Sequence, residues 1–354
     1  MGSRIFPRGD ALVDLDHPVK IVVSSHRFSP DIGGIETASA ILATEFARLG
    51  HEVRLITGTA DLDDQAWPFA VIRKPRSGAL LAHVRWGDVF WQNNISLQTL
   101  WAAPLARRPW VVTHQTWLAP NFDDQGWRAH LKRFLLRFGT NLAISRAVAE
   151  HIDLPCEILG NPYRESVFYE QPEVRRDRGL VFLGRLVSDK GAETLLEALR
   201  ELQPQGLRPR LTIIGTGPEE ARLRALTSAW ALDAQVTFAG AHTEAPLARL
   251  LNAHQIMVVP SLWAEPFGIV ALEGIACGAV VVGSSAGGLP EAIGPCGLTF
   301  PNGDAPALAA ALRRLLTEDG LIAQLRAGAP AHLSRHTGRA LAERYLEIFA
   351  RILA

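Results

Sequence analysis

Residues 19–25 read Val-Lys-Ile-Val-Val-Ser-Ser, an apolar run rich in β-branched residues that predicts a buried parallel strand. A loop containing Gly33 and Gly34 follows, then apolar residues at helical spacing (41–49), then a second strand-like run (51–57). Strand, glycine loop, helix and strand together make a βαβ unit. Ligands of such sheets bind at the carboxyl ends of the strands, so the two glycines lie where backbone could closely approach a phosphate or sugar. An ordinary βα turn is the alternative.

The same alternation of strands and helices resumes after a polar, charged segment. The chain of 354 residues is long enough for two domains. We predict an α/β chain with two Rossmann-like, doubly wound domains. The predicted parts are a disordered leader (1–18), a first domain (19–162), a linker (163–179), a second domain (180–335) and a C-terminal helix (336–354).

Composition excludes several classes of protein. The chain has 36 Lys and Arg against 36 Asp and Glu, so it lacks the basic excess of a nucleic-acid-binding protein. Three scattered cysteines are too few for a disulfide framework or a zinc site, and they suit a reducing cytoplasm. The Asp-x-Asp pairs Asp14/Asp16 and Asp61/Asp63 lie in the leader and in a polar loop, where we interpret them as solvated charges.

Two cations follow the first strand of the second domain. Gly184 ends that strand, and Arg185 and Lys190 precede a helix predicted from Ala192. A guanidinium can bind phosphate through two hydrogen bonds, an ammonium acts as a point charge, and a helix N-terminus favours anions. We interpret this segment as a diphosphate clamp, with a solvated loop as the alternative.

Residues 263–274 read Trp-Ala-Glu-Pro-Phe-Gly-Ile-Val-Ala-Leu-Glu-Gly and follow another predicted strand. Proline and glycine predict a tight loop, and the apolar residues predict a helix behind it. Glu265 would stand at the loop mouth and Glu273 about two turns along the helix. Backbone N–H groups at the helix start are expected to face an anionic ligand: those of Phe267, Gly268 and Ile269. A capped surface helix with two solvated glutamates is the alternative.

Further candidates stand at other strand ends. His114 ends the run Trp-Val-Val-Thr-His and could bind a sugar hydroxyl or act as a polar electrophile, with a structural histidine as the alternative. Two more glycine pairs follow strands of the second domain: Gly215 with Gly217, and Gly287 with Gly288. The first pair lacks the third glycine of a dinucleotide fingerprint, since Glu220 occupies that position, which argues against an NAD site.

Residues 127–138 combine bulky apolar side chains with four cations: Arg128, Lys132, Arg133 and Arg137. Such a segment is compatible with peripheral contact to an anionic membrane face. The alternative is a helix that packs its apolar side on the sheet.

Taken together, these motifs resemble those of glycosyltransferase family 4, retaining bacterial enzymes with the GT-B fold that are also described as glycosyl transferases group 1. The resemblance extends from about residue 19 to residue 295 and is specific only as a set. It rests on Gly33-Gly34-Ile35-Glu36, Gly184-Arg185-Leu186 with Lys190-Gly191, Gly215-Thr216-Gly217-Pro218, Glu265-Pro266-Phe267-Gly268 with Glu273, and Gly287-Gly288-Leu289-Pro290-Glu291.

The resemblance implies a nucleotide-sugar donor in a cleft between the two domains and a last helix that crosses back to the first domain. It implies that Arg185 and Lys190 hold the diphosphate, that Glu273 binds the ribose and that Glu265 binds the transferred sugar. His114 matches a histidine near the reacting sugar, and the glycine pairs would line the diphosphate and the acceptor. No metal or other cofactor is expected.

The predicted function is therefore a cytoplasmic glycosyltransferase that moves a sugar from a UDP- or GDP-sugar to an envelope glycan, a glycolipid or a small metabolite. A sugar-nucleotide epimerase of the same architecture and a non-catalytic nucleotide-sugar-binding subunit are the alternatives. Retention of configuration rests on the resemblance alone, and the sequence does not identify the base, the sugar or the acceptor.

Overall fold

The computed structural model describes residues 17–31, 33–60, 65–118 and 126–354. It divides the chain into two compact units, with unit 1 formed by Met1–Pro162 and His336–Ala354 and unit 2 by Tyr163–Arg335. Residues 1–16 of the predicted leader lie outside the described residues, as does the Asp61/Asp63 pair.

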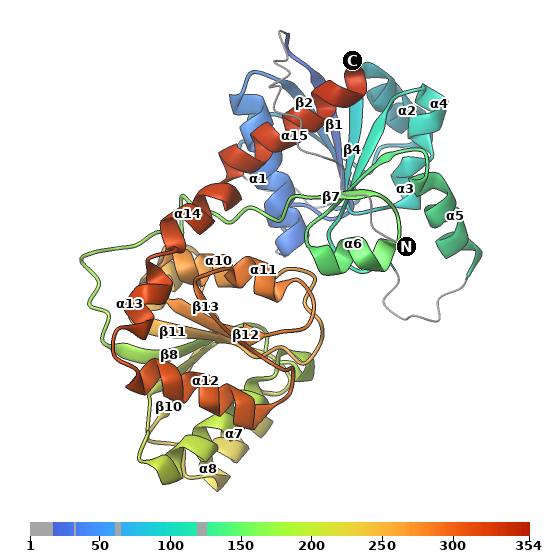
Figure 1. Cartoon of the computed structure of the whole chain (residues 1–354). Helices are drawn as coiled ribbons and strands as arrows, with labels where there is room; N and C mark the ends of the chain where they lie inside the picture. The colour runs from blue at the N-terminus through green and yellow to red at the C-terminus, as the bar shows by residue number, and fades with distance from the viewer. Residues whose placement is uncertain (1–16, 32, 61–64, 119–125) are drawn as a thin grey trace. The chain divides into compact units, whose positions relative to one another are not determined.

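Unit 1 is built on a seven-stranded parallel sheet with the order β3-β2-β1-β4-β5-β6-β7 (Figure 1). The order reverses direction between β1 and β4, which makes this pair of strands the switch point of a doubly wound sheet. The strands are β1 (Lys20–Ser25), β2 (Glu52–Thr57), β3 (Ala70–Arg73), β4 (Val89–Asn93), β5 (Trp110–His114), β6 (Thr140–Ala143) and β7 (Cys156–Ile158).

Helices connect most successive strands of unit 1, as predicted for the first two strands, whereas the described part of the connection between β2 and β3 contains no helix. α6 shows how a local signal sets a boundary, because Ser145 Oγ accepts a hydrogen bond from Val148 N over 3.2 Å and caps its first turn. The helices are α1 (Gly34–Arg48), α2 (Ser77–Trp86), α3 (Leu97–Leu100), α4 (Ala102–Ala106), α5 (Trp127–Leu136), α6 (Arg146–Ile152) and α15 (Gly338–Leu353).

The C-terminal helix α15 belongs to unit 1, as predicted, and packs against α1 (Figure 1). A Cβ atom at Gly338 would lie 2.5 Å from Ile41 Cγ2, which shows how closely the two helices approach. Tyr345 is fully buried between them and the sheet, and its hydroxyl lies 2.8 Å from Thr113 Oγ1. The helix therefore completes the core of unit 1 although it is remote in sequence.

Unit 2 repeats the plan with a six-stranded parallel sheet of order β10-β9-β8-β11-β12-β13. Its switch point lies between β8 and β11, the strands before the cation pair and the two-glutamate segment. The strands are β8 (Arg178–Leu183), β9 (Leu211–Ile214), β10 (Val236–Gly240), β11 (His254–Val259), β12 (Val280–Ser284) and β13 (Gly297–Phe300).

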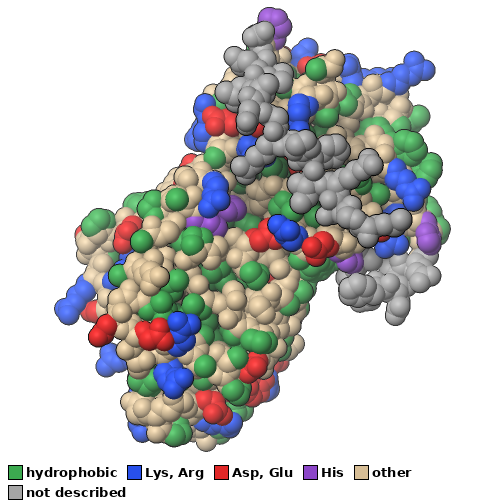
Figure 2. Space-filling view, in the orientation of Figure 1, with side chains coloured by type: hydrophobic (Ala, Val, Ile, Leu, Met, Phe, Trp, Pro, Cys, Tyr) green, Lys and Arg blue, Asp and Glu red, His purple; other side chains and the backbone are tan. Residues whose placement is uncertain are grey.

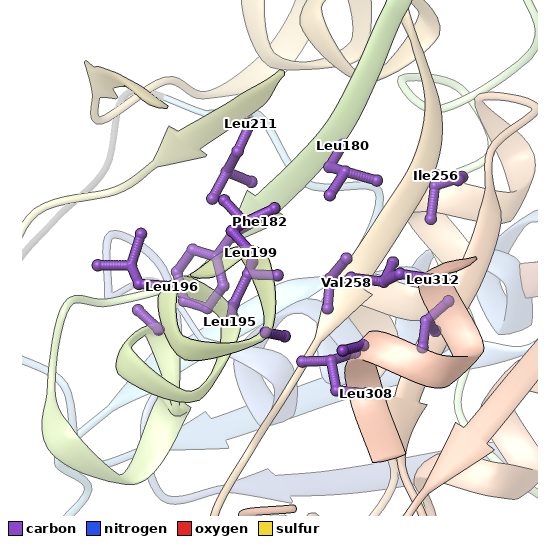
Figure 3. Packing of buried hydrophobic residues seen from close by; sticks show 14 of the residues in the cluster. Leu180, Phe182, Leu195, Leu196, Leu199, Leu211, Ile256, Val258, Leu308 and Leu312 are labelled. Carbon is purple, nitrogen blue, oxygen red and sulfur yellow. The ribbon is translucent and has the colours of Figure 1, made fainter. Parts of the chain in front are cut away.

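Helices cover both faces of this sheet, with α7 and α12 on one face and α10 and α11 on the other (Figure 1). Leucines of α7 and α12 pack on Leu180, Phe182 and Val258 of the central strands (Figure 3). The helices are α7 (Ala192–Leu202), α8 (Glu220–Ala229), α9 (Glu244–Asn252), α10 (Ile269–Ala276), α11 (Leu289–Ile293), α12 (Ala305–Thr317), α13 (Leu321–Arg326) and α14 (Ala329–Leu333), with 3₁₀ turns at Ser188–Lys190, Gln203–Gln205 and Ser334–His336.

The two Rossmann-like units are as predicted, and two details differ. Gly34 is the first residue of α1 rather than part of the predicted loop, and Gly33 before it has extended backbone (φ −179°). α10 begins at Ile269, so Glu273 stands about one turn along the helix rather than two.

Candidate functional site

The switch point of unit 2 brings the two predicted motifs together. Lys190 follows β8 and Glu265 follows β11, and Lys190 Nζ lies 2.6 Å from Glu265 Oε1. The same carboxylate oxygen accepts a hydrogen bond from Ser261 Oγ over 2.7 Å. Both side chains of the ion pair are largely buried, with exposures of 21% for Lys190 and 12% for Glu265. Because Oε1 takes both bonds, Oε2 is the oxygen that can accept from a ligand hydroxyl.

Close backbone contacts hold the two loops in this position. Gly191 has a left-handed backbone (φ +68°), and a Cβ atom there would lie 1.9 Å from the carbonyl oxygen of Pro260. Leu262 N donates to the carbonyl oxygen of Asp189 over 2.8 Å. Only glycine fits at position 191, so the sequence Lys-Gly sets how Lys190 is presented to Glu265.

Asn302 adds a polar clamp. Its Nδ2 donates to the carbonyl oxygens of Ser261 (2.9 Å), Leu262 (3.3 Å) and Trp263 (3.2 Å), and its Oδ1 accepts from Ala286 N (2.9 Å). One side chain therefore ties the loop after β11 to the loop after β12.

The double-glycine loop at Gly287-Gly288 packs directly against the two-glutamate segment. Glu265 and Gly287 form a parallel bridge, and Gly288 N donates to the carbonyl oxygen of Glu265 over 2.7 Å. Gly287 has φ +83°, and a Cβ atom there would lie 2.2 Å from that carbonyl oxygen. This close approach, rather than a ligand, accounts for the glycine at position 287.

The N-terminus of α10 has a geometry that favours the binding of an anion. Gly268 precedes the helix with φ +102°, and a Cβ atom there would lie 2.6 Å from Leu289 Cδ1. Among the described residues, no hydrogen-bond acceptor pairs with the N–H groups of Gly268, Ile269 or Val270. Unpaired N–H groups and the helix dipole make this end attractive to a phosphate or an oxyanion. Phe267, just before it, is buried.

Glu273 is the carboxyl group of this region with the largest pKa shift. Its side chain lies on α10 with a residue exposure of 9%, and burial raises its pKa from 4.5 to about 7. The positive charge of Arg164 opposes this shift, and the negative charge of Glu244 adds to it. Arg164 and Glu244 form an ion pair with each other. A carboxyl group held near neutrality in a buried position is a frequent property of binding sites.

The remaining predicted donor residues lie at the same edge of the sheet. Arg185 is exposed, and no described residue forms an ion pair with it. Gly184, Gly215 and Gly217 bring the loops after β8 and β9 into contact. A Cβ atom at Gly215 would lie 1.9 Å from the carbonyl oxygen of Gly184, and one at Gly217 would lie 2.3 Å from that of Leu186. Contact between the loops therefore explains Gly215 and Gly217, whereas a Cβ atom at Gly184 would lie nearest the ring of Phe182, at 3.4 Å.

His114 lies in unit 1 and is fully buried at the end of β5. Asn141 Nδ2 donates to the carbonyl oxygen of Leu136 (2.9 Å), so its Oδ1 accepts from His114 Nε2 (3.1 Å). Burial lowers the pKa of His114 to about 4, so the imidazole is neutral at physiological pH. His114 Nδ1 has no hydrogen-bond partner within the described part of the chain. A neutral imidazole can contact a ligand as an acceptor, but it cannot serve as a cationic acid.

The carboxyl edge of the unit 1 sheet also carries a network of buried amides. Asn93 Nδ2 donates to Ser39 Oγ (2.7 Å), and Gln115 Nε2 donates to Asn93 Oδ1 (2.8 Å) and Asn161 Oδ1 (2.9 Å). Asn93 also donates to the carbonyl oxygen of Ile35 in α1, which fixes the helix that starts at Gly34. These groups satisfy one another and hold the switch point of unit 1 together.

The structure thus brings Arg185, Lys190, Glu265 and Glu273 into unit 2, while Gly33, Gly34 and His114 belong to unit 1. Ser261, Asn302 and Arg164 were not predicted, because single polar residues outside a motif give no signal in one sequence. Within the described ranges no group of three or more His, Cys, Asp or Glu side chains could hold a metal ion.

Sequence comparisons relate part of this chain to known glycosyltransferases. Residues 177–318 match the family model described as glycosyl transferases group 1. A D-inositol 3-phosphate glycosyltransferase from Corynebacterium jeikeium is 33% identical over 194 residues, which cover 52% of this chain and 43% of that protein. A putative colanic acid biosynthesis glycosyltransferase from Salmonella typhimurium is 31% identical over 140 residues, 38% of this chain and 34% of that protein. The matched region therefore spans less than half the length of these relatives.

Solved structures resemble the whole chain. HepE from Anabaena in complex with UDP has a TM-score of 0.79 at 20% identity, covering 95% of this chain and 100% of that one. Sucrose-phosphate synthase from Thermosynechococcus elongatus has a TM-score of 0.74 at 21% identity, covering 94% and 99%. Such low identity establishes only the fold, which is the predicted GT-B fold. The match over residues 177–318 relates that part of the chain to glycosyl transferases group 1.

Proposed function

We propose that this protein is a retaining glycosyltransferase that transfers a sugar from a nucleotide-diphosphate sugar without a metal ion. The observation that carries the proposal is the convergence at the switch point of unit 2. A paired lysine and glutamate, a helix start with unpaired N–H groups and a buried glutamate all lie at the edge where parallel sheets bind ligands. The group 1 match covers the same residues.

Each group has a distinct role in this proposal. Arg185 and Lys190 bind the diphosphate, with the N–H groups at the start of α10 on its oxygens. Glu273 accepts hydrogen bonds from the ribose hydroxyls. Glu265 binds hydroxyls of the transferred sugar through Oε2, since Oε1 is taken by Lys190 and Ser261.

The chemistry follows from charge. The bond between the sugar C1 atom and the diphosphate oxygen breaks, and the nucleoside diphosphate leaves with the electron pair. Lys190, Arg185 and the helix start stabilise the negative charge that grows on the leaving group. An acceptor hydroxyl bonds to C1 and gives its proton to a leaving phosphate oxygen. His114 is proposed to accept a hydrogen bond from a sugar hydroxyl and transfers no proton, because it is already neutral.

A UDP-sugar is the first donor to test, because the solved neighbour HepE was obtained with UDP and with UDP-glucose. A GDP-sugar remains the second choice. The acceptor is proposed to be an envelope glycan, a glycolipid or a small metabolite. The two named relatives are described as a D-inositol 3-phosphate glycosyltransferase and a putative colanic acid biosynthesis glycosyltransferase, so neither description singles out one of these classes.

The test is a thermal-shift screen of the full chain with UDP, GDP, ADP and TDP, followed by hydrolysis assays with sugars of the best nucleotide. Ligand that binds the folded state stabilises it by RT ln(1 + [L]/Kd), so the correct base separates from the others. Assays with and without EDTA test metal independence. Absence of any nucleotide shift would refute the donor site. Binding without turnover would favour the non-catalytic subunit, and interconversion of sugar nucleotides without an acceptor would favour the epimerase.

A further inference from the structure

Helix α5 of unit 1 and the two residues after it carry an exposed apolar stripe that the proposed chemistry does not use. Trp127, Leu131, Phe134 and Phe138 are exposed by 69%, 37%, 53% and 63%. They stand four, three and four positions apart, which places them on one side of a helix. The rings of Phe134 and Phe138 lie against each other with centroids 5.1 Å apart.

The opposite side of α5 faces the body of unit 1. Ala129 and Leu136 are its buried residues, and Leu136 belongs to an apolar cluster with Leu100 and Val112. At about 100° per residue, these two positions lie diametrically across the helix from the stripe. The helix is therefore anchored by one apolar side and presents a second apolar side outward. The sequence alternative, in which the whole apolar side packs on the sheet, holds only for the anchored side.

Cations flank the outward stripe on both sides. Arg128 and Lys132 follow one edge of the stripe, and Arg133 and Arg137 follow the other. The guanidinium of Arg128 lies 5.5 Å from the centre of the Trp127 ring. No Asp or Glu occurs between Gly126 and Ala149. Asp123 and Asp124 precede this stretch and lie outside the described residues. Figure 2 shows hydrophobic and basic side chains together at the edge of unit 1 where Figure 1 draws α5.

We propose that α5 with Arg137 and Phe138 is a docking helix that lies in the surface of a membrane containing anionic lipids. An outward apolar stripe with cations along both edges fits an interface in which rings enter the acyl boundary and cations contact headgroups. A protein partner would need acidic groups opposite all four cations, whereas an anionic bilayer supplies them along both edges. Within the described parts of the chain no helix is long and apolar enough to span a bilayer.

The test is co-sedimentation of the full chain with vesicles of phosphatidylcholine alone and of phosphatidylcholine with 30% phosphatidylglycerol, at low and high salt. Three variants accompany the wild type. Trp127→Ser with Phe134→Ser removes the stripe, and Arg128→Gln with Arg133→Gln removes one cation from each edge. Leu105→Ser with Arg85→Gln is the control, because it removes an exposed leucine and an exposed arginine elsewhere on unit 1.

We expect binding to the anionic vesicles, much weaker binding to phosphatidylcholine alone, and a loss of binding at high salt. Each cation near such a surface contributes about fivefold in affinity, so the double arginine variant should bind about 25-fold more weakly. The stripe variant should lose binding, and the control should keep it. Circular dichroism melts confirm that the variants fold.

Failure of the wild type to bind anionic vesicles would overturn the proposal, as would an equal loss of binding in the control. A dimer that the stripe variant converts to a monomer, without vesicle binding, would assign the stripe to a second copy of this chain instead. The assay needs no sugar donor, so its outcome is independent of the proposed transferase activity.

Discussion

The buried carboxyl group of Glu273 gives the sharpest quantitative prediction. Burial raises its pKa from 4.5 to about 7 in the folded chain. The folded state therefore binds a proton more tightly than the unfolded state, and stability falls as pH rises from about 4.5 through about 7. Each pKa unit corresponds to about 1.36 kcal/mol, so the cost above pH 8 is about 3 kcal/mol. Glu273→Gln keeps the shape and removes the charge, and it should recover most of that cost.

The assay is thermal or denaturant unfolding of wild type and Glu273→Gln at pH 5 and pH 8.5. If more than one unfolding transition is seen, the one to analyse is the transition that moves when a nucleotide binds. We expect the variant to be more stable at pH 8.5 by about 3 kcal/mol and nearly equal at pH 5. The difference between the unfolding free energies of the two proteins at each pH cancels the contribution of every other titrating group. An equal difference at both pH values would refute a raised pKa.

The same pair of proteins tests the ribose role. A carboxylate accepts two strong hydrogen bonds, whereas a protonated carboxyl group also donates, so ribose binding should favour the ionised form. Nucleotide affinity of the wild type should therefore rise with pH through about 7 relative to the variant. Using the variant as reference also removes the titration of the nucleotide phosphate. If calorimetry gives the same pH profile for both proteins, Glu273 does not bind the ribose.

Three further predictions concern the loops around Lys190. Lys190→Ala should reduce turnover about a thousandfold with any sugar donor, because it removes charge from the leaving group, and near-normal rates would refute the clamp. Gly191→Ala should lower the unfolding free energy of unit 2 by more than 3 kcal/mol. The control Gly206→Ala has a similar φ but nothing within 4 Å of its Cβ, so it should cost only about 1 kcal/mol. Equal melting temperatures of the two variants would contradict the contact with Pro260. Asn302→Ala should lower the unfolding free energy by about 1–2 kcal/mol and speed hydrogen exchange at residues 261–264 and 286. Unchanged exchange there would show that the Asn302 side chain does not hold these loops in place.

Much of the fold follows from the sequence because the central strands are continuous apolar runs. β1, β8, β11 and β12 are buried on both faces, so their patterns contain little ambiguity. The strands absent from the prediction are β3, β7 and β13, each of three or four residues and partly exposed at or near a sheet edge. Such short runs satisfy no periodicity, and only pairing with a neighbour makes them strands.

The sequence predicts that the candidate residues of unit 2 gather at one edge of the sheet, but it does not predict their contacts with one another. The motifs identify Lys190 and Glu265 as ligand-binding groups, yet in the folded chain they bind each other. Likewise, the sequence predicts that Gly215, Gly217 and Gly287 face a ligand. In the structure, backbone of a neighbouring loop occupies the positions that their Cβ atoms would take. Contacts between residues far apart in sequence carry no local pattern, so single-sequence reasoning assigns every special residue to the ligand.

In the proposed function, the Lys190–Glu265 pair changes which groups attract the diphosphate from a distance. With its charge balanced by a carboxylate 2.6 Å away, Lys190 contributes little to the field beyond the site. Arg185 is exposed, so Arg185 and the N-terminus of α10 would provide the long-range attraction for the diphosphate. Lys190 acts at short range, where a phosphate oxygen can share the ammonium with Glu265, since that group has three donors. In the proposed donor complex, Glu265 stays fixed by Lys190 and Ser261 while its other oxygen binds the sugar. A single ion pair would then couple the position of the leaving group to that of the transferred ring.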